Sequence, residues 1–263
     1  MKRNYTWMAA AALLALAGCS REPLAEEPGT EILTATIVDG AGTRTTYDGD
    51  TGKFSWQEGD EIAIYQEKEA SSTYKSQVRP VLNPTTDRSA TFVYSKETGY
   101  TRTGYAVYPA AVAKSWDGSV LTVTLPSTYA VSDATPLPLV AVNGSETADL
   151  PFLHTCGLLR IKCDELPEST VTVTLDKGIT GDFVVSFDPD TEDPSITAVT
   201  ASDTNPATVT FTGASTTSAT LDLPLPCGDY TSVSVTSGDK TELVSVPFTV
   251  TRGVGKKVHV SFE

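Results

Sequence analysis

Apolar and polar side chains alternate along short segments of this chain from residue 32 onwards. In residues 32–38, Leu33, Ala35 and Ile37 fall on one face and threonines on the other, and residues 170–175 alternate threonine with valine or leucine in the same way. A period of two residues is typical of a β-strand that buries one face. No segment sustains the period of about 3.6 residues that an amphipathic helix requires. The chain is therefore expected to be all-β.

Turn-forming residues separate these segments at intervals of about ten residues, which is typical of a β-sandwich. Besides residues 32–38, the expected strands are residues 61–67, 89–95, 104–109, 119–126, 152–163, 170–176, 182–188, 207–211, 219–226, 231–237 and 244–263. A single helical turn is expected at residues 110–114. The segment 127–151 is rich in proline, serine and aspartate, so we place a domain boundary at its end. This gives an N-terminal domain of residues 32–150 and a C-terminal domain of residues 151–263.

The N-terminus has the organisation of a bacterial export signal. Lys2 and Arg3 precede an apolar run over residues 9–17, which is too short to span a bilayer as a helix. The order Leu-Ala-Gly-Cys that ends at Cys19 resembles a lipobox, which predicts a signal peptide of residues 1–18 and a lipid on Cys19. The alternative is an ordinary signal peptide that contains a cysteine. Residues 19–31 are acidic and contain prolines, and we interpret them as a flexible tether.

The charge of the chain excludes one class of partner. The formal net charge is −14, and removal of residues 1–18 takes away two positive charges and no negative ones, leaving −16. A surface of this kind repels phosphate backbones, so no nucleic-acid partner is expected.

The cysteines that remain after Cys19 do not make a complete disulfide framework, because Cys156, Cys163 and Cys227 are an odd number. Cys156 and Cys163 lie seven residues apart on one expected strand. That separation puts them on opposite faces, too far apart for a disulfide. Cys227 could pair with either of them, and buried free thiols are the other interpretation.

We find no constellation of residues that indicates an enzyme, a metal site or a cofactor. His154 and His259 are the only histidines, and neither has the spacing of a catalytic triad or a zinc site. Both are interpreted as structural. The acidic run at residues 188–193 fits a solvated hairpin tip better than a calcium loop, because it lacks the glycine and the distal glutamate of an EF-hand.

Aromatic residues offer a binding alternative. Trp56, Trp116, Tyr105 and Tyr108 could form a platform on which sugars stack, or they could pack in the core. The first interpretation describes a monomeric surface lipoprotein that binds glycans. Burial of the two indoles would exclude that platform.

Five sequence blocks, taken in order, resemble the fimbrillin (Mfa-like) family of Bacteroides-type bacteria. They are TRTTYDG and FSWQEGDEIAIY within residues 43–65, GYAVYPA (104–110), LTVTLPSTYAV (121–131) and LPFLHTCGLLRIKC (150–163). The resemblance is weakest from residue 190 to 263. Within the second block, Trp56 followed by Gly59 and Asp60 predicts a tight turn that a buried tryptophan holds in place.

The resemblance implies two tandem transthyretin-like antiparallel β-sandwich domains in a surface lipoprotein of the outer membrane, anchored through Cys19. It implies a non-catalytic fimbrial subunit that acts in adhesion, with other fimbrial subunits as partners through β-strand exchange. Shaft, tip, anchor and accessory positions all remain open, as does a ligand on a host or bacterial surface. In polymerising relatives an arginine-directed protease removes the first strand. Arg44 is the candidate cleavage site here, and an ordinary loop arginine is the alternative.

Overall fold

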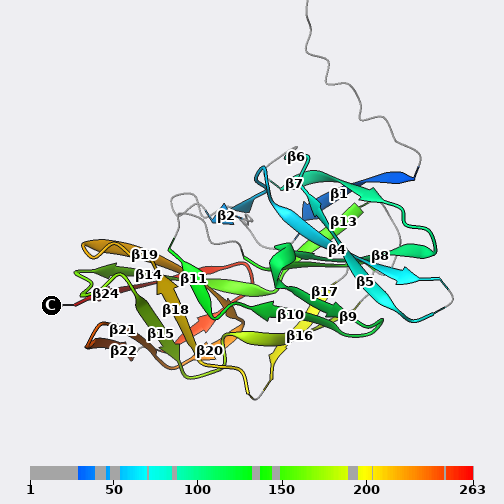
Figure 1. Ribbon diagram of the computed structural model, residues 1–263. Coiled ribbons are helices and arrows are strands. Elements are labelled where there is room, and N and C mark those ends of the chain that lie inside the picture. The colour runs from blue at the N-terminus through cyan, green and yellow to red at the C-terminus, as the bar shows by residue number, and fades with distance from the viewer. Residues whose placement is uncertain are drawn as a thin grey trace, which may run out of the picture.

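The computed structural model describes residues 29–38, 46–47, 54–69, 71–84, 88–131, 137–143, 149–188, 195–202, 204–245 and 247–262. Within these ranges the chain forms β-strands and one short 3₁₀ turn, η1 (Ala110–Val112) (Figure 1). This confirms the all-β prediction and the expected helical turn. None of the described segments forms a helix long and apolar enough to cross a membrane. The signal peptide, Cys19 and Arg44 lie outside the described residues.

An eight-stranded sheet forms the first layer. Its order is β5 (Tyr74–Pro80), β4 (Glu61–Lys68), β8 (Tyr100–Tyr108), β12 (Leu139–Val142), β13 (Asp149–His154), β1 (Thr30–Ile37), β7 (Ser89–Ser95) and β6 (Asn83–Pro84). The chain runs from β5 at one edge directly into β6 at the other, so the sheet curls round on itself. The amide of Leu82, between these strands, donates a hydrogen bond to the carbonyl oxygen of Thr91 at 3.0 Å. The curled sheet encloses an apolar core that includes Leu33, Trp56, Phe92, Tyr108 and Phe152.

A four-stranded sheet covers the outer face of this first layer. Its order is β17 (Ser195–Ala201), β16 (Gly181–Asp188), β10 (Leu121–Leu125) and β9 (Ala113–Trp116). A second core lies between the two sheets, where Tyr65 and Val140 of the larger sheet belong to one cluster with Val123 and Phe183 of the smaller one. The two sheets together are called the first lobe.

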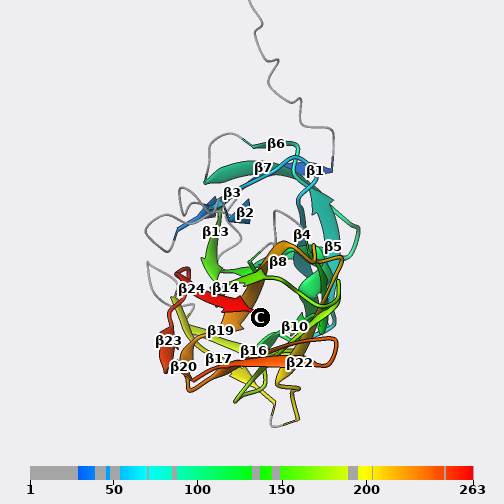
Figure 2. The same ribbon diagram turned by 90° about the vertical axis from the view of Figure 1, so that its left-hand side faces the viewer.

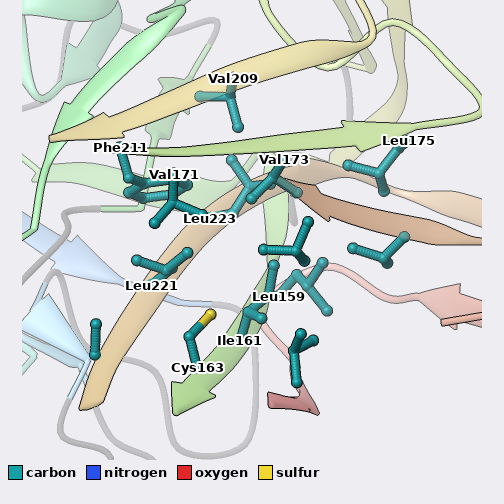
Figure 3. Close-up of a cluster of buried hydrophobic side chains, with 14 of the residues drawn as sticks. Leu159, Ile161, Cys163, Val171, Val173, Leu175, Val209, Phe211, Leu221 and Leu223 are labelled. Atoms are coloured by element: carbon teal, nitrogen blue, oxygen red, sulfur yellow. The ribbon is translucent and has the colours of Figure 1, made fainter. Parts of the chain in front are cut away.

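The second lobe is a sandwich of a five-stranded and a three-stranded sheet, and it faces the viewer in Figure 2. The larger sheet has the order β11 (Thr128–Ala130), β18 (Thr208–Thr212), β15 (Val171–Leu175), β21 (Val233–Ser237) and β22 (Lys240–Val244). The smaller has the order β19 (Ser218–Pro226), β14 (Cys156–Asp164) and β24 (Gly255–Ser261). Figure 3 shows their shared core, in which Leu159, Ile161 and Cys163 of β14 point towards Val171 and Val173 of β15.

Two short ribbons complete the described strands: β2 (Thr46–Tyr47) with β3 (Phe54–Ser55), and β20 (Gly228–Tyr230) with β23 (Phe248–Val250). The sheets are largely antiparallel. Parallel pairs also occur among the described strands, namely β1 with β13, β11 with β18, and β14 with β24. Each parallel pair joins strands that are distant in sequence, because a parallel connection needs a long crossover.

The two lobes exchange segments of chain. β10, from the first half of the sequence, pairs with β16 from the second half in the first lobe. β11, which follows β10, pairs with β18 in the second lobe. The expected boundary at residue 150 falls within β13, so the sheets do not separate there. How the chain divides into folding units stays a prediction.

Candidate strand-exchange site around β1

β1 lies in the interior of the first sheet and is hydrogen-bonded along both of its edges. It runs antiparallel to β7 from Thr30 to Thr36 and parallel to β13 from Thr34 to Ile37. At its end, the amide of Ile37 donates to the carbonyl oxygen of Arg88 at 2.9 Å, and the amide of Val38 donates to that of Phe152 at 3.0 Å. An interior strand with two neighbours holds more main-chain hydrogen bonds than an edge strand of the same length.

The side chains of β1 divide cleanly between two faces. Leu33, Ala35 and Ile37 point into the curled sheet and are buried in its apolar core. Thr34 and Thr36 point outward and are half-buried, and the hydroxyl groups of Thr36 and Ser89 lie 3.3 Å apart. The strand thus contributes to the core as well as to the hydrogen-bond ladder.

Trp56 packs next to β1 at the centre of the same core and is 2% exposed. Its ring meets Phe92, Tyr108 and Phe152 in edge-to-face contacts with centroid distances of 5.5, 5.1 and 5.5 Å. The indole Nε1 donates a hydrogen bond to the carbonyl oxygen of Arg88 at 3.2 Å. The amide of Ile37 donates to that same oxygen, so Trp56 and β1 are both held by the carbonyl group of Arg88.

A tight turn follows Trp56. Gly59 has a φ of +88°, which an L side chain rarely adopts. The amide of Asp60 donates to the carbonyl oxygen of Gln57 at 3.2 Å, and the Asp60 carboxylate accepts from the Gln57 amide at 2.7 Å. Tyr108 Oη donates to the same carboxylate at 2.7 Å. The turn residues Gly59 and Asp60 therefore fix the start of β4 against β8.

A buried polar layer closes the end of the core beside the start of β1. Glu31 and Arg102 form a bidentate ion pair, with Nε–Oε2 at 3.2 Å and Nη2–Oε1 at 3.0 Å. Tyr94 Oη donates to Gln66 Oε1 at 2.8 Å, and burial is the main cause of the raised pKa of Tyr94. This layer was not predicted from the sequence, although Glu31 lies two positions before Leu33 and so shares its face.

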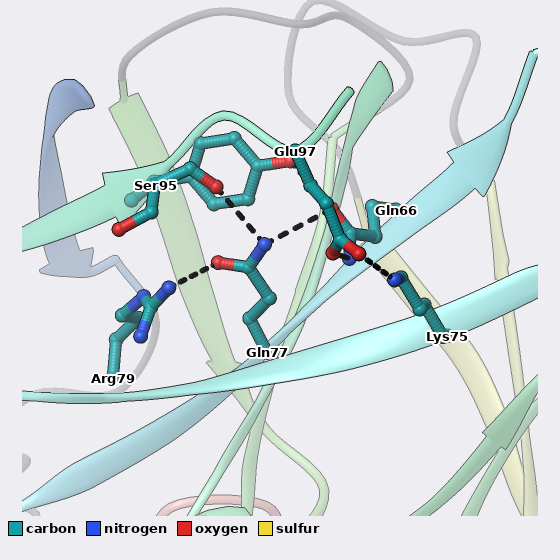
Figure 4. Close-up of polar contacts among 7 residues, drawn as sticks. Gln66, Lys75, Gln77, Arg79, Ser95 and Glu97 are labelled. Carbon is teal, nitrogen blue, oxygen red and sulfur yellow. Dashed lines mark hydrogen bonds and ion pairs between the residues drawn. The ribbon is translucent and has the colours of Figure 1, made fainter. Parts of the chain in front are cut away.

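Gln66 links this buried layer to the surface (Figure 4). Its Nε2 donates to Glu97 Oε2 at 2.9 Å, and Glu97 in turn contacts the ammonium group of Lys75. The hydrogen bond from Lys75 is the main reason that the pKa of Glu97 is lowered. Gln77 Nε2 donates to Gln66 Oε1 at 3.1 Å and to the carbonyl oxygen of Ser95 at 2.9 Å. These bonds join β4, β5 and β7 where the sheet curls.

The proposed sugar platform is wrong. Trp56 is buried in the core, and Trp116 is 6% exposed and stacks on Tyr105 at a centroid distance of 4.1 Å. Tyr108 is buried as well. The two indoles are packing residues and offer no face to a sugar ring.

The two histidines lie in different environments. His154 is fully buried, and burial followed by the charges of Arg252 and Arg88 lowers its pKa to about 3. His259 is exposed, and its Nε2 lies 2.7 Å from Asp164 Oδ2. Hydrogen bonds from His259, Ser218 and Lys162 lower the pKa of the Asp164 carboxyl to about 2.

Cys156 and Cys163 are buried in different clusters, as expected for opposite faces of β14. Burial raises the pKa of the Cys156 thiol to about 12 and that of the Cys163 thiol to about 11, and neither forms a disulfide with the exposed Cys227. Within the described ranges no three potential ligands gather in a metal site. Of the acidic run at 188–193, Asp188 alone is described.

Comparisons with known proteins give similarities to solved structures. No family model and no curated protein matches the chain. A proposed cell adhesion protein from Bacteroides ovatus matches with a TM-score of 0.48 and 15% identity, over 89% of this chain and 92% of that chain. A fimbrial protein from the same species gives a TM-score of 0.36 and 13% identity, over 87% of this chain and 48% of that chain. The fimbrial anchor protein Mfa2 from Porphyromonas gingivalis gives 0.31 and 11%, over 81% of each chain.

Proposed function

We propose that this chain is a non-catalytic subunit of a cell-surface fimbria that assembles by β-strand addition and acts in adhesion. The observation that carries the proposal is the position of β1, the first described strand, between β7 and β13. Its departure would leave two unpaired strand edges and an apolar groove where Leu33, Ala35 and Ile37 had been. A strand from another subunit has the shape and hydrogen-bonding groups to fill that groove.

The order of the chain favours release of β1. Because β1 comes before every other described strand, one cut behind it frees the strand without removing any other part of the sheets. Arg44 follows the last residue of β1, Ile37, by seven positions. A cut after Arg44 would release the expected lipid on Cys19, the tether and β1 together. A cut after Arg21 would release the lipid and leave β1 in its groove.

The same proposal assigns the location. Lipidation of Cys19 would hold the precursor at the outer membrane, exposed at the surface, until processing transfers the subunit to the fimbria. Shaft, tip, anchor and accessory positions are all compatible with β1 in its groove, and the precursor differs from the assembled subunit by the removal of that strand.

The proposal is tested by the intact mass of the protein released from cells, before and after treatment with an arginine-specific protease. The expected product begins at Thr45 and appears together with oligomers that resist denaturant and dissociate on heating. Arg44→Ala should abolish both, whereas Arg21→Ala should leave both unchanged. A lipidated monomer that still begins at Cys19 after treatment would contradict the proposal.

A further inference from the structure

The groove occupied by β1 has a charged end as well as an apolar floor. Along the inward face of β1, Glu31 precedes Leu33, Ala35 and Ile37 at alternate positions. Glu31 lies opposite Tyr94 of β7, whose ring is buried in the same core. One strand therefore presents a carboxylate to one end of the groove and three apolar side chains to the rest.

Arg102 receives this carboxylate from across the sheet. It projects from β8, and β12 and β13 lie between β8 and β1 in the strand order. The side chain of Arg102 is 3% exposed and that of Glu31 is 27% exposed, and Arg102 Nε and Nη2 both donate to the Glu31 carboxylate. Its Nη1 also donates to the carbonyl oxygen of Thr103 at 3.2 Å. A cavity of about 320 Å³, lined by Glu31, Tyr94, Lys96, Tyr100, Thr101 and Arg102, opens beside the ion pair.

Arg102 belongs to β8, so it stays in place when β1 leaves. Its guanidinium group then loses the Glu31 carboxylate, and any strand that fills the groove covers this charge again, which is strongly unfavourable without a negative partner. A strand that fills the groove with an uncharged residue at this point would leave that loss uncorrected. A strand that brings a carboxylate would restore the bidentate pair.

We propose that the groove selects its incoming strand by charge: the partner is a β-strand of another subunit that places an Asp or Glu side chain at the Arg102 end and apolar side chains at the three following inward positions. This inference rests on the proposed function. The ion pair also sets register, because a shift of one residue would turn the carboxylate outward. A shift of two would place it in the apolar layer around Phe92.

The test uses the full chain with residues 39–45 replaced by the recognition sequence of a site-specific protease, which makes it independent of Arg44. After cleavage, a labelled peptide of residues 30–38, TEILTATIV, competes with the cleaved segment for the groove. Its affinity is compared with that of the Glu31→Gln peptide. A Thr34→Gln peptide is the matched control, because Thr34 points outward. In this comparison the peptides differ and the protein does not, so all three peptides meet the same groove.

The Glu31→Gln peptide should bind about 30-fold more weakly, as expected when the buried Arg102 loses its charged partner, whereas the Thr34→Gln peptide should bind like the native peptide. On a chain with Arg102→Met, the native and Glu31→Gln peptides should bind with equal affinity. Equal binding of the native and Glu31→Gln peptides to the unaltered groove would overturn charge selection and leave strand addition standing. If neither peptide enters the groove, strand addition itself is wrong, and the selection falls with it.

Discussion

Arg160 on β14 and Asp222 on β19 lie directly opposite each other and form a bidentate ion pair in the second lobe. The Nε–Oδ1 distance is 2.7 Å and the Nη2–Oδ2 distance is 2.6 Å. The Asp222 side chain is 4% exposed and that of Arg160 is 17% exposed. Loss of one partner from such a pair leaves the other charge poorly solvated, so the pair behaves as a unit.

Asp222→Ala is therefore expected to lower the free energy of unfolding by about 3 kcal/mol, measured by urea denaturation. The double variant Arg160→Met/Asp222→Leu removes both charges and keeps apolar volume at both positions. It should recover most of the loss. A double variant no more stable than Asp222→Ala would show that the charge left behind is not the cause.

Trp56→Ala should lower the free energy of unfolding by about 3–5 kcal/mol, because it removes a large buried ring and its three aromatic contacts. Trp56→Phe should cost less, since it keeps part of the ring volume and loses the hydrogen bond to the Arg88 carbonyl. Val184→Ala is the control, since Val184 is exposed and should change stability by less than about 0.5 kcal/mol. Similar losses in all three variants would contradict a core role for Trp56.

Gly157→Ala should destabilise the second lobe by about 1–3 kcal/mol through overpacking. A Cβ at this position would lie 2.5 Å from the carbonyl oxygen of Thr251 and 2.6 Å from Val250 Cγ1. Gly59→Asn is the control, because Gly59 has open space around it and asparagine tolerates positive φ, so its cost should stay below about 1 kcal/mol. Thermal unfolding checks both, and a neutral Gly157→Ala would mean that the backbone near Thr251 yields easily.

The buried His154 should make stability fall on mild acidification. In the unfolded chain the pKa of His154 is near the ordinary 6.5, whereas in the folded chain it is about 3. At a pH between these two values, the unfolded chain therefore binds more protons than the folded chain. The free energy of unfolding should therefore decrease by about 2 kcal/mol from this group between about pH 7 and pH 5. Arg252 and Arg88 act on His154 in the same direction as burial.

His154→Gln should remove that part of the pH dependence, and His259→Gln, at an exposed position, serves as the matched variant. Urea denaturation at the two pH values measures the difference for each protein. Above pH 5 most carboxyl groups in the unfolded chain are already ionised, so they contribute little to the slope. An unchanged pH dependence in His154→Gln would show that this histidine is not its source.

The alternation of side chains predicted most strands because each strand carries its own signal of burial. Residues 170–176 were expected as a strand with Val171, Val173 and Leu175 on one face, and β15 buries these three side chains. Pairing between distant strands was not predictable in the same way. Tertiary packing of distant segments decides such pairings, as in the parallel pair of β14 with β24 and the antiparallel pair of β10 with β16.

The candidate site was predictable in part. The strand over residues 32–38 was expected, and β1 covers Thr30–Ile37, so the apolar face of the groove follows directly from the sequence. Glu31 was assigned to the tether because an acidic residue after an acidic, proline-containing stretch indicates solvent. Its inward role depends on Arg102, which lies 71 positions away along the chain. The alternation of apolar and polar residues along one strand cannot predict a partner that lies so far away in the sequence.

The exchange of segments between the lobes has a mechanical consequence. Along the described strands, the chain passes from one lobe to the other between β10 and β11, β11 and β12, β13 and β14, β15 and β16, and β17 and β18. If a single linker joined the two lobes, tension would extend the linker and separate the lobes while each stayed folded. Here several covalent connections join the lobes in parallel, so a pulling force is divided among them. The lobes can separate only after the hydrogen bonds between paired strands of at least one sheet have broken.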